Sequence, residues 1–255
     1  MSTCLVCRAN VEPFLSFGRM PIANGFLKEA GFAREFFYHL SVGHCPGCHM
    51  VQLTELVPPA LLFHDRYAYM SSISQRMVAH FKEFANDVRQ RLGRDPFIVE
   101  VGSNDGIMLQ NFARAGLRHL GVEPSENVAK LAMARGVQSV VRFFDEQAGH
   151  ELRGQHGAAD ALLGANVICH IPDLRSFLEG TRALLKDDGL FIFEEPYLGD
   201  IIAKTAYDQI YDEHVYYFCL ASLSHVFAQH DLEIVDVAPQ NTHGGSMRWY
   251  VARKG

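Results

Sequence analysis

The stretch from Phe97 to Gly106 constrains the fold of this chain more than any other segment. Its first half, Phe97–Val101, is a short apolar run typical of a buried parallel strand. A turn bracketed by Gly102 and Gly106 follows, and apolar residues then recur at helical spacing from Met108. Glycines allow so sharp a turn because they carry no Cβ atom. The sequence therefore predicts a strand, a tight turn and a helix around a site of nucleotide size.

Acidic side chains decide which ligand suits this turn. The turn lacks the G-x-G-x-x-G pattern that seats a pyrophosphate on a helix N-terminus. Instead, Glu100 lies at the end of the strand, and Glu123 follows the next apolar run, His119–Val122. Two acids repel a diphosphate but suit a ligand with a cationic head and a ribose diol. S-adenosylmethionine has both features, and we predict it as the ligand; the alternative is an ordinary α/β turn with solvated acids.

Composition sets the class of protein. A chain of 255 residues with 48% hydrophobic content can bury one large core and carry a small extra module. A formal charge of −6 gives no global basic field to recruit nucleic acid. Apolar runs fall short of the ~20 residues of a membrane span, and the N-terminus lacks the apolar region of a secretory signal. We expect a cytoplasmic protein without membrane or nucleic-acid partners.

In a cytoplasmic protein the cysteines need a role other than disulfides. Two C-x-x-C pairs, Cys4 with Cys7 and Cys45 with Cys48, are separated by 37 residues. Each pair can present two thiolates to one tetrahedral ion, so the two pairs predict a four-sulfur zinc site. We expect this zinc to be structural, because a module as small as residues 1–57 needs a cross-link such as a bound metal to be stable. Alternating apolar residues between the pairs predict a small β-rich insert.

Residues 58–93 are predicted to be a linker and a long helix. The irregular part contains Tyr67 and Tyr69, followed by two serines. These tyrosines either close over a substrate and donate their hydroxyls, or pack the zinc module onto the main domain. Apolar residues then repeat every three to four positions from Ile73 to Leu92, which predicts an amphipathic helix that ends at Gly93.

Residues 94–255 are predicted to be an α/β domain. The expected strands are Phe97–Val101, Leu117–Glu123, Val137–Phe144, a run ending near Asn166, Leu190–Phe193, Glu233–Val237 and Ser246–Arg253. In open α/β sheets the ligand crevice lies at the carboxyl ends of the strands. Asn166 and His170 are therefore expected to face the site. The alternative for His170 is a loop histidine that caps a helix begun by Asp173.

The segment Tyr207–Cys219 combines four tyrosines with acids and one histidine. Apolar surroundings lower the pKa of a histidine, while a neighbouring carboxylate raises it and can hold the ring. His214, beside Glu213, is therefore a candidate general base. The alternative is a buried aromatic segment with a satisfied histidine. The later turn His243–Ser246 either approaches a ligand or merely connects a hairpin.

Taken together, these segments resemble the S-adenosylmethionine-dependent C-methyltransferases that act on nucleotide-linked keto-deoxysugars. The resemblance covers essentially the whole chain. The segments that match the family are the paired C-x-x-C motifs and residues 67–72, 100–106, 121–125, 165–167, 211–218 and 243–246.

This resemblance implies an α/β fold, namely a Rossmann-like class I methyltransferase domain with a small zinc-binding N-terminal module. It implies that the cofactor is bound by Glu100, Gly102, Asn104, Asp105, Gly106, Glu123, Pro124, Ser125, Phe144 and Asn166. It also implies that His214 is the base, oriented by Glu213, that Tyr211 and Tyr67 or Tyr69 position the sugar, and that Asn166 and His170 face the ketone.

The chain departs from the family at its third expected domain, which helps to hold the nucleotide-sugar. The sequence stops just after the strand that follows His243–Ser246, so we expect that domain to be missing. A separate polypeptide, a longer chain or another way of holding the substrate would then be needed. Two other functions stay open: a small-molecule O- or N-methyltransferase, and a protein-binding zinc module on a domain that binds no cofactor.

Overall fold

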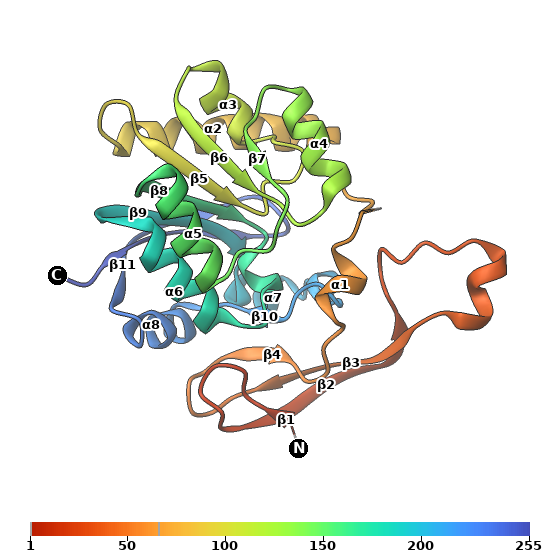
Figure 1. Ribbon diagram of the computed structural model, residues 1–255. Helices are drawn as coiled ribbons and strands as arrows, with labels where there is room; N and C mark the ends of the chain where they lie inside the picture. The colour runs from red at the N-terminus through yellow and green to blue at the C-terminus, as the bar shows by residue number, and fades with distance from the viewer. Residues whose placement is uncertain (1, 66) are drawn as a thin grey trace. The chain divides into compact units, whose positions relative to one another are not determined.

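The computed structural model describes residues 2–65 and 67–255 (Figure 1). Residue 1 of the expected zinc module and residue 66 of the expected linker lie outside the described residues. The chain forms two compact units. Unit 1 contains residues 1–62, 166–175 and 194–249, and unit 2 contains residues 63–165, 176–193 and 250–255. These units differ from the expected division at residues 57 and 93, because two later segments join unit 1.

Unit 2 contains the predicted parallel strands. They are β5 (Phe97–Val101), β6 (Arg118–Val122), β7 (Ser139–Val140) and β8 (Ala159–Ala165). Val101 at the end of β5 pairs with Val122 of β6 and with Gly164 of β8, all in parallel. Every residue of β5 is buried, which explains its continuous apolar sequence. The predicted strand, turn and helix are therefore present, with α3 (Leu109–Arg114) after the turn.

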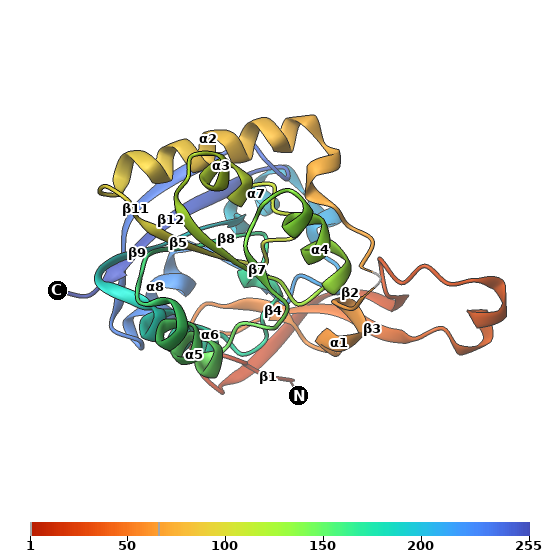
Figure 2. The same ribbon diagram turned by 45° about the horizontal axis from the view of Figure 1, so that its top comes forward.

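Helices accompany these strands in unit 2. They are α2 (Gln75–Arg91), α4 (Glu126–Ala134), α5 (Glu146–His156) and most of α6 (Leu174–Leu184). α2 is the long helix predicted from its apolar periodicity, and it packs against α3, which packs against β6 (Figure 2). The single turn η2 (Ser71–Ile73) precedes α2.

The parallel strands belong to a seven-stranded sheet of order β11-β12-β9-β8-β5-β6-β7. Here β9 is Leu185–Pro196, β11 is Leu232–Gln240 and β12 is Ser246–Arg253. Both β9 and β12 contain residues of unit 1 and of unit 2. The last strand, predicted as Ser246–Arg253, is confirmed.

Unit 1 contains a second sheet of order β1-β2-β3-β4-β10. Its strands are β1 (Ser2–Thr3), β2 (Asn10–Pro21), β3 (Phe37–His44), β4 (Val51–Leu53) and β10 (Tyr216–Tyr217), paired in antiparallel fashion. β2 and β3 form a long hairpin whose outer end carries η1 (Glu29–Arg34) (Figure 1). The β-rich insert is thus confirmed, and a strand from the aromatic segment completes its sheet.

The remaining elements of unit 1 are short helices. They are α1 (Pro59–Leu62), η3 (Ile168–His170), α7 (Leu198–Lys204), η4 (Tyr207–Gln209) and α8 (Leu220–Ala228). The helix expected after Asp173 begins at Leu174, as predicted. Among the described residues, no helix combines the length and apolar character that crossing a bilayer requires.

One predicted strand was largely wrong. Val137–Phe144 was expected to be a strand, but only Ser139–Val140 pair with β6. β7 is the last strand of its sheet, and the apolar residues Val141 and Phe143 after it are 46% and 48% exposed. Phe144 is buried beyond the end of the strand, in edge contact with Phe177.

A substitution at Gly106 tests how tightly the predicted turn is packed. Gly106 has φ +77°, and a Cβ there would lie 3.0 Å from side-chain atoms of both Ala132 and Val137. Gly116 has φ +70° with nothing within 4 Å of its Cβ position. We expect Gly116→Ala to lower the unfolding free energy by about 1 kcal/mol, the cost of the left-handed backbone. Gly106→Ala should cost about 2–4 kcal/mol, because overpacking adds to it.

Urea denaturation of both variants measures the difference. Equal losses for the two variants would show that the contacts with Ala132 and Val137 relax without cost.

Candidate functional site

The turn after β5 is the sharp turn that the sequence predicts, with positive φ angles at both of its glycines. Gly102, Asn104 and Gly106 have φ angles of +65°, +49° and +77°. The N–H of Gly102 donates to the carbonyl of Val122 at 2.8 Å, which joins the turn to the end of β6. Within unit 2, the ends of two neighbouring parallel strands thus meet at this turn.

Glu100 and Glu123 are both buried here. Burial, followed by the charges of Glu123 and Asp105, raises the pKa of Glu100 well above its usual range. Burial also raises the pKa of Glu123. The carboxylate of Glu123 accepts N–H bonds from Asn104 at 2.9 Å and from Ser125 at 2.8 Å. Oε2 of Glu100 is buried without a hydrogen-bond partner among the described residues.

These features fit S-adenosylmethionine. A desolvated acid pair in a water-poor site is stabilised by a ligand that brings positive charge and hydroxyl donors. Two further buried hydroxyls, of Ser103 and Ser125, also have no partner among the described residues. Glu100, Gly102 and Glu123 would hold the cofactor, and Ser125 and the half-buried Pro124 lie beside Glu123 at the start of α4.

Asn104 and Asp105 serve another purpose in the structure. Asn104 accepts the N–H of Ser71 at 3.0 Å and donates to the carbonyl of Tyr69 at 3.1 Å. Asp105 is fully buried, accepts from Ser72 and pairs with Arg135 at 3.1 Å. These side chains hold the linker onto the turn, and a direct contact with the cofactor stays a prediction for both.

The linker tyrosines therefore belong to unit 2. The carbonyl of Tyr67 accepts from Asn127 at 2.9 Å, and the side chain of Tyr69 is 46% exposed. The turn thus holds the linker through the carbonyl of Tyr69, and α4 holds it through the carbonyl of Tyr67. Their contact with a substrate stays a prediction.

Unit 1 brings together the other predicted residues. The rings of His170 and His214 stack with centroids 5.2 Å apart and an angle of 27°, and the ring of Tyr211 lies 4.3 Å from that of His214. His170 is carried by η3, and the N–H of Val215 donates to the carbonyl of Cys169 at 2.8 Å. The loop after β8 and the aromatic segment are thus joined beside the two imidazoles.

A backbone carbonyl fixes the tautomer of His214. Its Nδ1 lies 2.8 Å from the carbonyl oxygen of Gln209. Because a carbonyl only accepts, Nδ1 carries the proton, and Nε2 is the acceptor nitrogen. The carboxylate of Glu213 accepts from the amide of Asn24 at 2.7 Å, and its expected orienting role toward His214 stays a prediction.

Both imidazoles are neutral at physiological pH. Burial lowers the pKa of His214 to about 4, although the bond to Gln209 opposes the shift. Burial, together with the charge of His214, holds the pKa of His170 well below its usual range. Burial and the charge of Glu213 raise the pKa of Tyr211, so its phenol stays protonated. The cluster therefore offers a neutral acceptor, Nε2 of His214, beside a neutral donor, the phenol of Tyr211.

The loop that carries Asn166 and His170 is anchored by Glu195. Oε1 of this fully buried carboxylate accepts the N–H groups of Val167 at 3.0 Å and Ile168 at 2.6 Å, with a longer contact to Cys169. Burial raises the pKa of Glu195 to about 7 despite these bonds. Asn166 itself donates from its side-chain amide to Nε2 of His243 at 3.2 Å.

Sequence reasoning gave no role to Asn24, Glu195 or Gln209, and it left the turn that contains His243 open between a ligand contact and a hairpin connection. The position of Glu195 at the end of a predicted strand was a usable signal, as was the turn that contains His243. Asn24 and Gln209 gave no sequence signal, because their contacts depend on a local conformation that no sequence pattern predicts.

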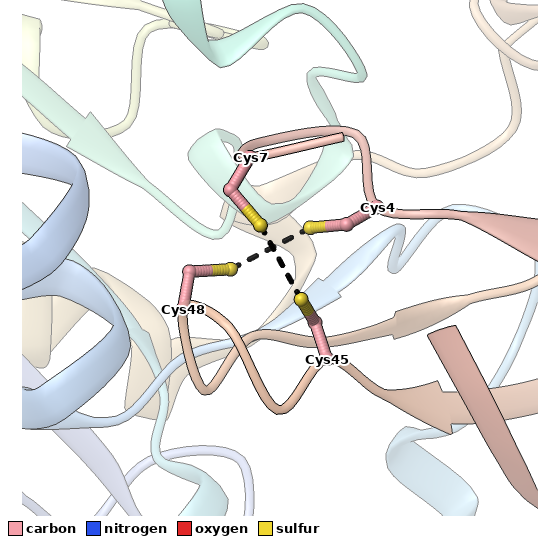
Figure 3. Close-up of side chains that lie close together, drawn as sticks. All are labelled: Cys4, Cys7, Cys45 and Cys48. Atoms are coloured by element: carbon pink, nitrogen blue, oxygen red, sulfur yellow. Dashed lines mark hydrogen bonds between the residues drawn. The ribbon is translucent and has the colours of Figure 1, made fainter. Parts of the chain in front are cut away.

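The four cysteines of the C-x-x-C motifs converge on one point (Figure 3). The Sγ atoms of Cys4 and Cys48 are 3.5 Å apart, and those of Cys7 and Cys45 are 3.4 Å apart. All four ligand atoms lie within 4.8 Å of one another. This donor set and spacing fit a tetrahedral zinc ion with four thiolates.

The two cysteine loops have the same backbone pattern. Cys4 N–H donates to Ala9 O, and Cys45 N–H donates to Met50 O, both at 2.8 Å. Arg8 and His49, at equivalent positions, have φ +66° and +60°. Each loop therefore turns its two thiols inward by the same hydrogen-bonded turn.

Two family models match this chain. One, described as "Putative zinc binding domain", matches residues 4–63. The other, described as "Methyltransferase domain", matches residues 64–237, more than half of the chain.

Curated relatives are similar over different spans. C-methyltransferase NovU of Streptomyces niveus is 36% identical over 241 residues, which are 93% of this chain and 57% of that protein. Ubiquinone biosynthesis O-methyltransferase of Ruegeria pomeroyi is 29% identical over 126 residues, which are 44% of this chain and 47% of that protein. The chain thus spans less than two thirds of either relative.

Solved structures share the fold. The PH0226 protein from Pyrococcus horikoshii OT3 matches with a TM-score of 0.56 at 14% identity, over 73% of this chain and 95% of that one. Magnesium protoporphyrin IX methyltransferase from Synechocystis PCC 6803, solved with bound SAM, matches with a TM-score of 0.51 at 13% identity, over 71% and 79%. The fold is that of class I S-adenosylmethionine-dependent methyltransferases, as predicted.

We expect about one zinc ion per purified chain, held by the four cysteines. Cys45→Ser should lose this zinc and lower Tm by about 10 °C, since the metal staples a module with a small core of its own. Cys219→Ser is the matched control, because Cys219 lies outside the metal cluster. Metal analysis and thermal unfolding measure both effects, and full zinc content in the Cys45 variant would contradict the assignment.

Proposed function

This chain belongs to the methyltransferase family, and from that premise we propose that it transfers a methyl group from S-adenosylmethionine to a carbon beside a ketone, in a nucleotide-linked keto-deoxysugar. The observation that carries the proposal is the orientation of His214. Its proton is held on Nδ1 by the carbonyl of Gln209, so Nε2 is an acceptor within a cluster of neutral polar rings.

Methylation of carbon makes specific demands on these residues. A carbon beside a ketone becomes a nucleophile only when its proton is removed and the electron pair moves toward the ketone oxygen. His214 accepts that proton on Nε2, and a positioned base of this kind contributes about 10²–10⁴-fold to the rate. When bound, S-adenosylmethionine supplies the methyl group and a thioether leaving group, so the new carbon–carbon bond forms as the carbon–sulfur bond breaks.

The developing oxyanion needs a hydrogen-bond donor. Tyr211 suits this role, because burial and the charge of Glu213 raise its pKa and keep its proton on the phenol oxygen. Such a donor in a water-poor site contributes roughly 3 kcal/mol. His170, stacked on His214, would face the ketone, and Tyr67 or Tyr69 would position the sugar. The proposed cofactor residues belong to unit 2, and the two imidazoles belong to unit 1.

O-methylation is the second candidate, favoured by the ubiquinone biosynthesis O-methyltransferases. Their similarity to this chain covers less than half of it, as with the 44% matched in Ruegeria pomeroyi. NovU, named a C-methyltransferase, is similar over 93% of the chain. Carbon as the acceptor is therefore the better supported proposal. A separate polypeptide that helps to hold the nucleotide stays a prediction.

His214→Asn tests the base. The amide of Asn can replace Nδ1 as a donor to Gln209, but it has nothing in place of Nε2. We expect at least about a 10²-fold loss of methyl transfer, with the dissociation constant for S-adenosylmethionine near that of the wild type. Hydrogen exchange of the probe dTDP-4-keto-6-deoxyglucose in D₂O without cofactor should stop as well. Unchanged turnover would remove His214 from the mechanism.

The pH dependence gives a second test. Burial disfavours the charged imidazolium, so His214 stays neutral as pH falls and loses its acceptor nitrogen only near pH 4. Among the neighbours, His170 has a pKa held well below its usual range by burial and Tyr211 keeps its proton, while the charge of His243 lowers the pKa of His214 further, and Glu213 is held by Asn24. We expect kcat/KM to stay flat from about pH 8 to about pH 5.5. With an ordinary histidine as the base, kcat/KM would fall about 10-fold by pH 5.5.

Rates with dTDP-4-keto-6-deoxyglucose, taken at pH values where circular dichroism reports a folded protein, measure this profile. A midpoint near pH 6.5 would contradict a desolvated base.

A further inference from the structure

Cys169 lies beside the two imidazoles of unit 1 and has no role in the proposed mechanism. Its Sγ atom and one ring nitrogen each of His170 and His214 lie within 4.8 Å of one another. One thiol and two imidazoles are a donor set that zinc prefers. Ligands around a tetrahedral zinc ion lie about 3.3–3.8 Å apart, so these three atoms need to close by at most about 1.5 Å. The residues that the structure describes thus hold a second candidate metal cluster besides the four cysteines.

Two segments of unit 1 bring these ligands together, and a backbone hydrogen bond joins the segments. Cys169 and His170 are neighbours in η3, whose N-terminal N–H groups donate to the carboxylate of Glu195. The carbonyl of Cys169 accepts the N–H of Val215, the residue after His214, at 2.8 Å. The sulfur and both imidazoles are therefore held near one another before a metal ion binds, which lowers the cost of assembling the site.

The hydrogen bond from His214 to Gln209 is of the kind that supports a zinc ligand. An imidazole that binds a metal ion usually donates its other ring N–H to a carbonyl or a carboxylate, which fixes the ring. Nδ1 of His214 lies 2.8 Å from the carbonyl oxygen of Gln209, so Nε2 keeps the lone pair that a metal ion binds. The same lone pair takes the carbon-bound proton in the proposed function.

The charges around Cys169 favour a divalent cation. Burial, followed by the charges of Glu195 and Glu213, raises the pKa of the Cys169 thiol well above its usual range. A thiolate alone is therefore unfavourable there, whereas a bound dication offsets the thiolate and both carboxylates. When zinc binds, the Zn–S bond forms, the S–H bond breaks and the proton leaves to the solvent. His170 is only half-buried, so the cluster is open to an ion from solvent on that side.

We propose that Cys169, His170 and His214 form a second, exchangeable zinc site that leaves its fourth position to water. This site is weaker than the four-cysteine site, because it has one thiolate instead of four and its ligands must close on the ion. The metal site itself does not depend on the proposed function. Its consequence does: zinc on Nε2 of His214 occupies the base, so zinc in excess of the structural ion inhibits methyl transfer.

Cobalt(II) is the probe for the site, because it enters tetrahedral zinc sites and a cobalt–thiolate bond absorbs in the near ultraviolet. Protein that carries zinc in its four-cysteine site is titrated with Co²⁺, and thiolate sites of this kind keep their zinc. We expect one further equivalent of cobalt to bind, with the absorption band of a single thiolate. Cys169→Ser should abolish the band. Cys219→Ser is the matched control and should keep it, since Cys219 belongs to neither cluster.

His214→Asn tests the site from the other segment, since it keeps the sulfur and removes Nε2. Its affinity for cobalt should fall at least about 10-fold, as changes in a metal site typically cost. Thermal unfolding of each variant sets a titration temperature at which it is folded, and the two ligand variants test the site independently. A wild-type protein without the band, a band that persists in Cys169→Ser, or unchanged affinity in His214→Asn would overturn the proposal.

Inhibition by zinc tests the link to the reaction. Methyl transfer to dTDP-4-keto-6-deoxyglucose is measured at free Zn²⁺ concentrations set by a metal buffer. We expect reversible inhibition of the wild type, and Cys169→Ser should need at least about 10-fold more free zinc for half-inhibition. Without added zinc, Cys169→Ser should keep the wild-type rate, and equal inhibition of the two proteins would overturn the inhibitory role. If wild-type protein does not methylate this sugar, the proposed function fails for that substrate class, and the cobalt titration still decides the metal site.

Discussion

The pairing of β10 with β4 is the constraint on which the chemistry of unit 1 depends. β10 has two residues and β4 has three, so this pairing is too short to be stable alone. β4 begins at Val51, directly after the second cysteine loop ends its hydrogen-bonded turn at Met50. A zinc ion that holds the loop also holds β4, and through β4 it holds Tyr216 beside His214. In the proposed mechanism the metal therefore supports the base through the position of its segment.

A second set of contacts from the N-terminal module supports the same segment. The N–H of Ala23 donates to Asp212 at 3.1 Å, and Asn24 donates to Glu213 at 2.7 Å. Burial raises the pKa of Asp212, and these bonds compensate part of that cost. The acids beside His214 therefore attach the segment to the module, while the backbone carbonyl of Gln209 accepts from Nδ1 of the imidazole.

The sequence predicted what depends on periodicity and turn chemistry. β5 and β12 were predicted with their observed bounds, because each apolar run ends at a glycine turn or a charged residue. α5 was missed because Glu146–His156 is mostly polar, although Asp145 caps it by accepting from Ala148 at 2.7 Å. The cysteine cluster followed from spacing. The tautomer of His214 did not, because Gln209 reaches it through an irregular turn.

The low pKa of His214 shapes the mechanism. Stacked imidazoles cannot both be charged at a centroid distance of 5.2 Å, and burial of His170 and His214 keeps both neutral. The same burial weakens the base, because a ring with a pKa of about 4 holds a proton poorly. Such a base removes a carbon-bound proton only when the electron pair left behind is stabilised at once. In the proposed mechanism, rate must then come from donors placed at the oxygen, and the phenol of Tyr211, which keeps its proton, is the donor beside His214.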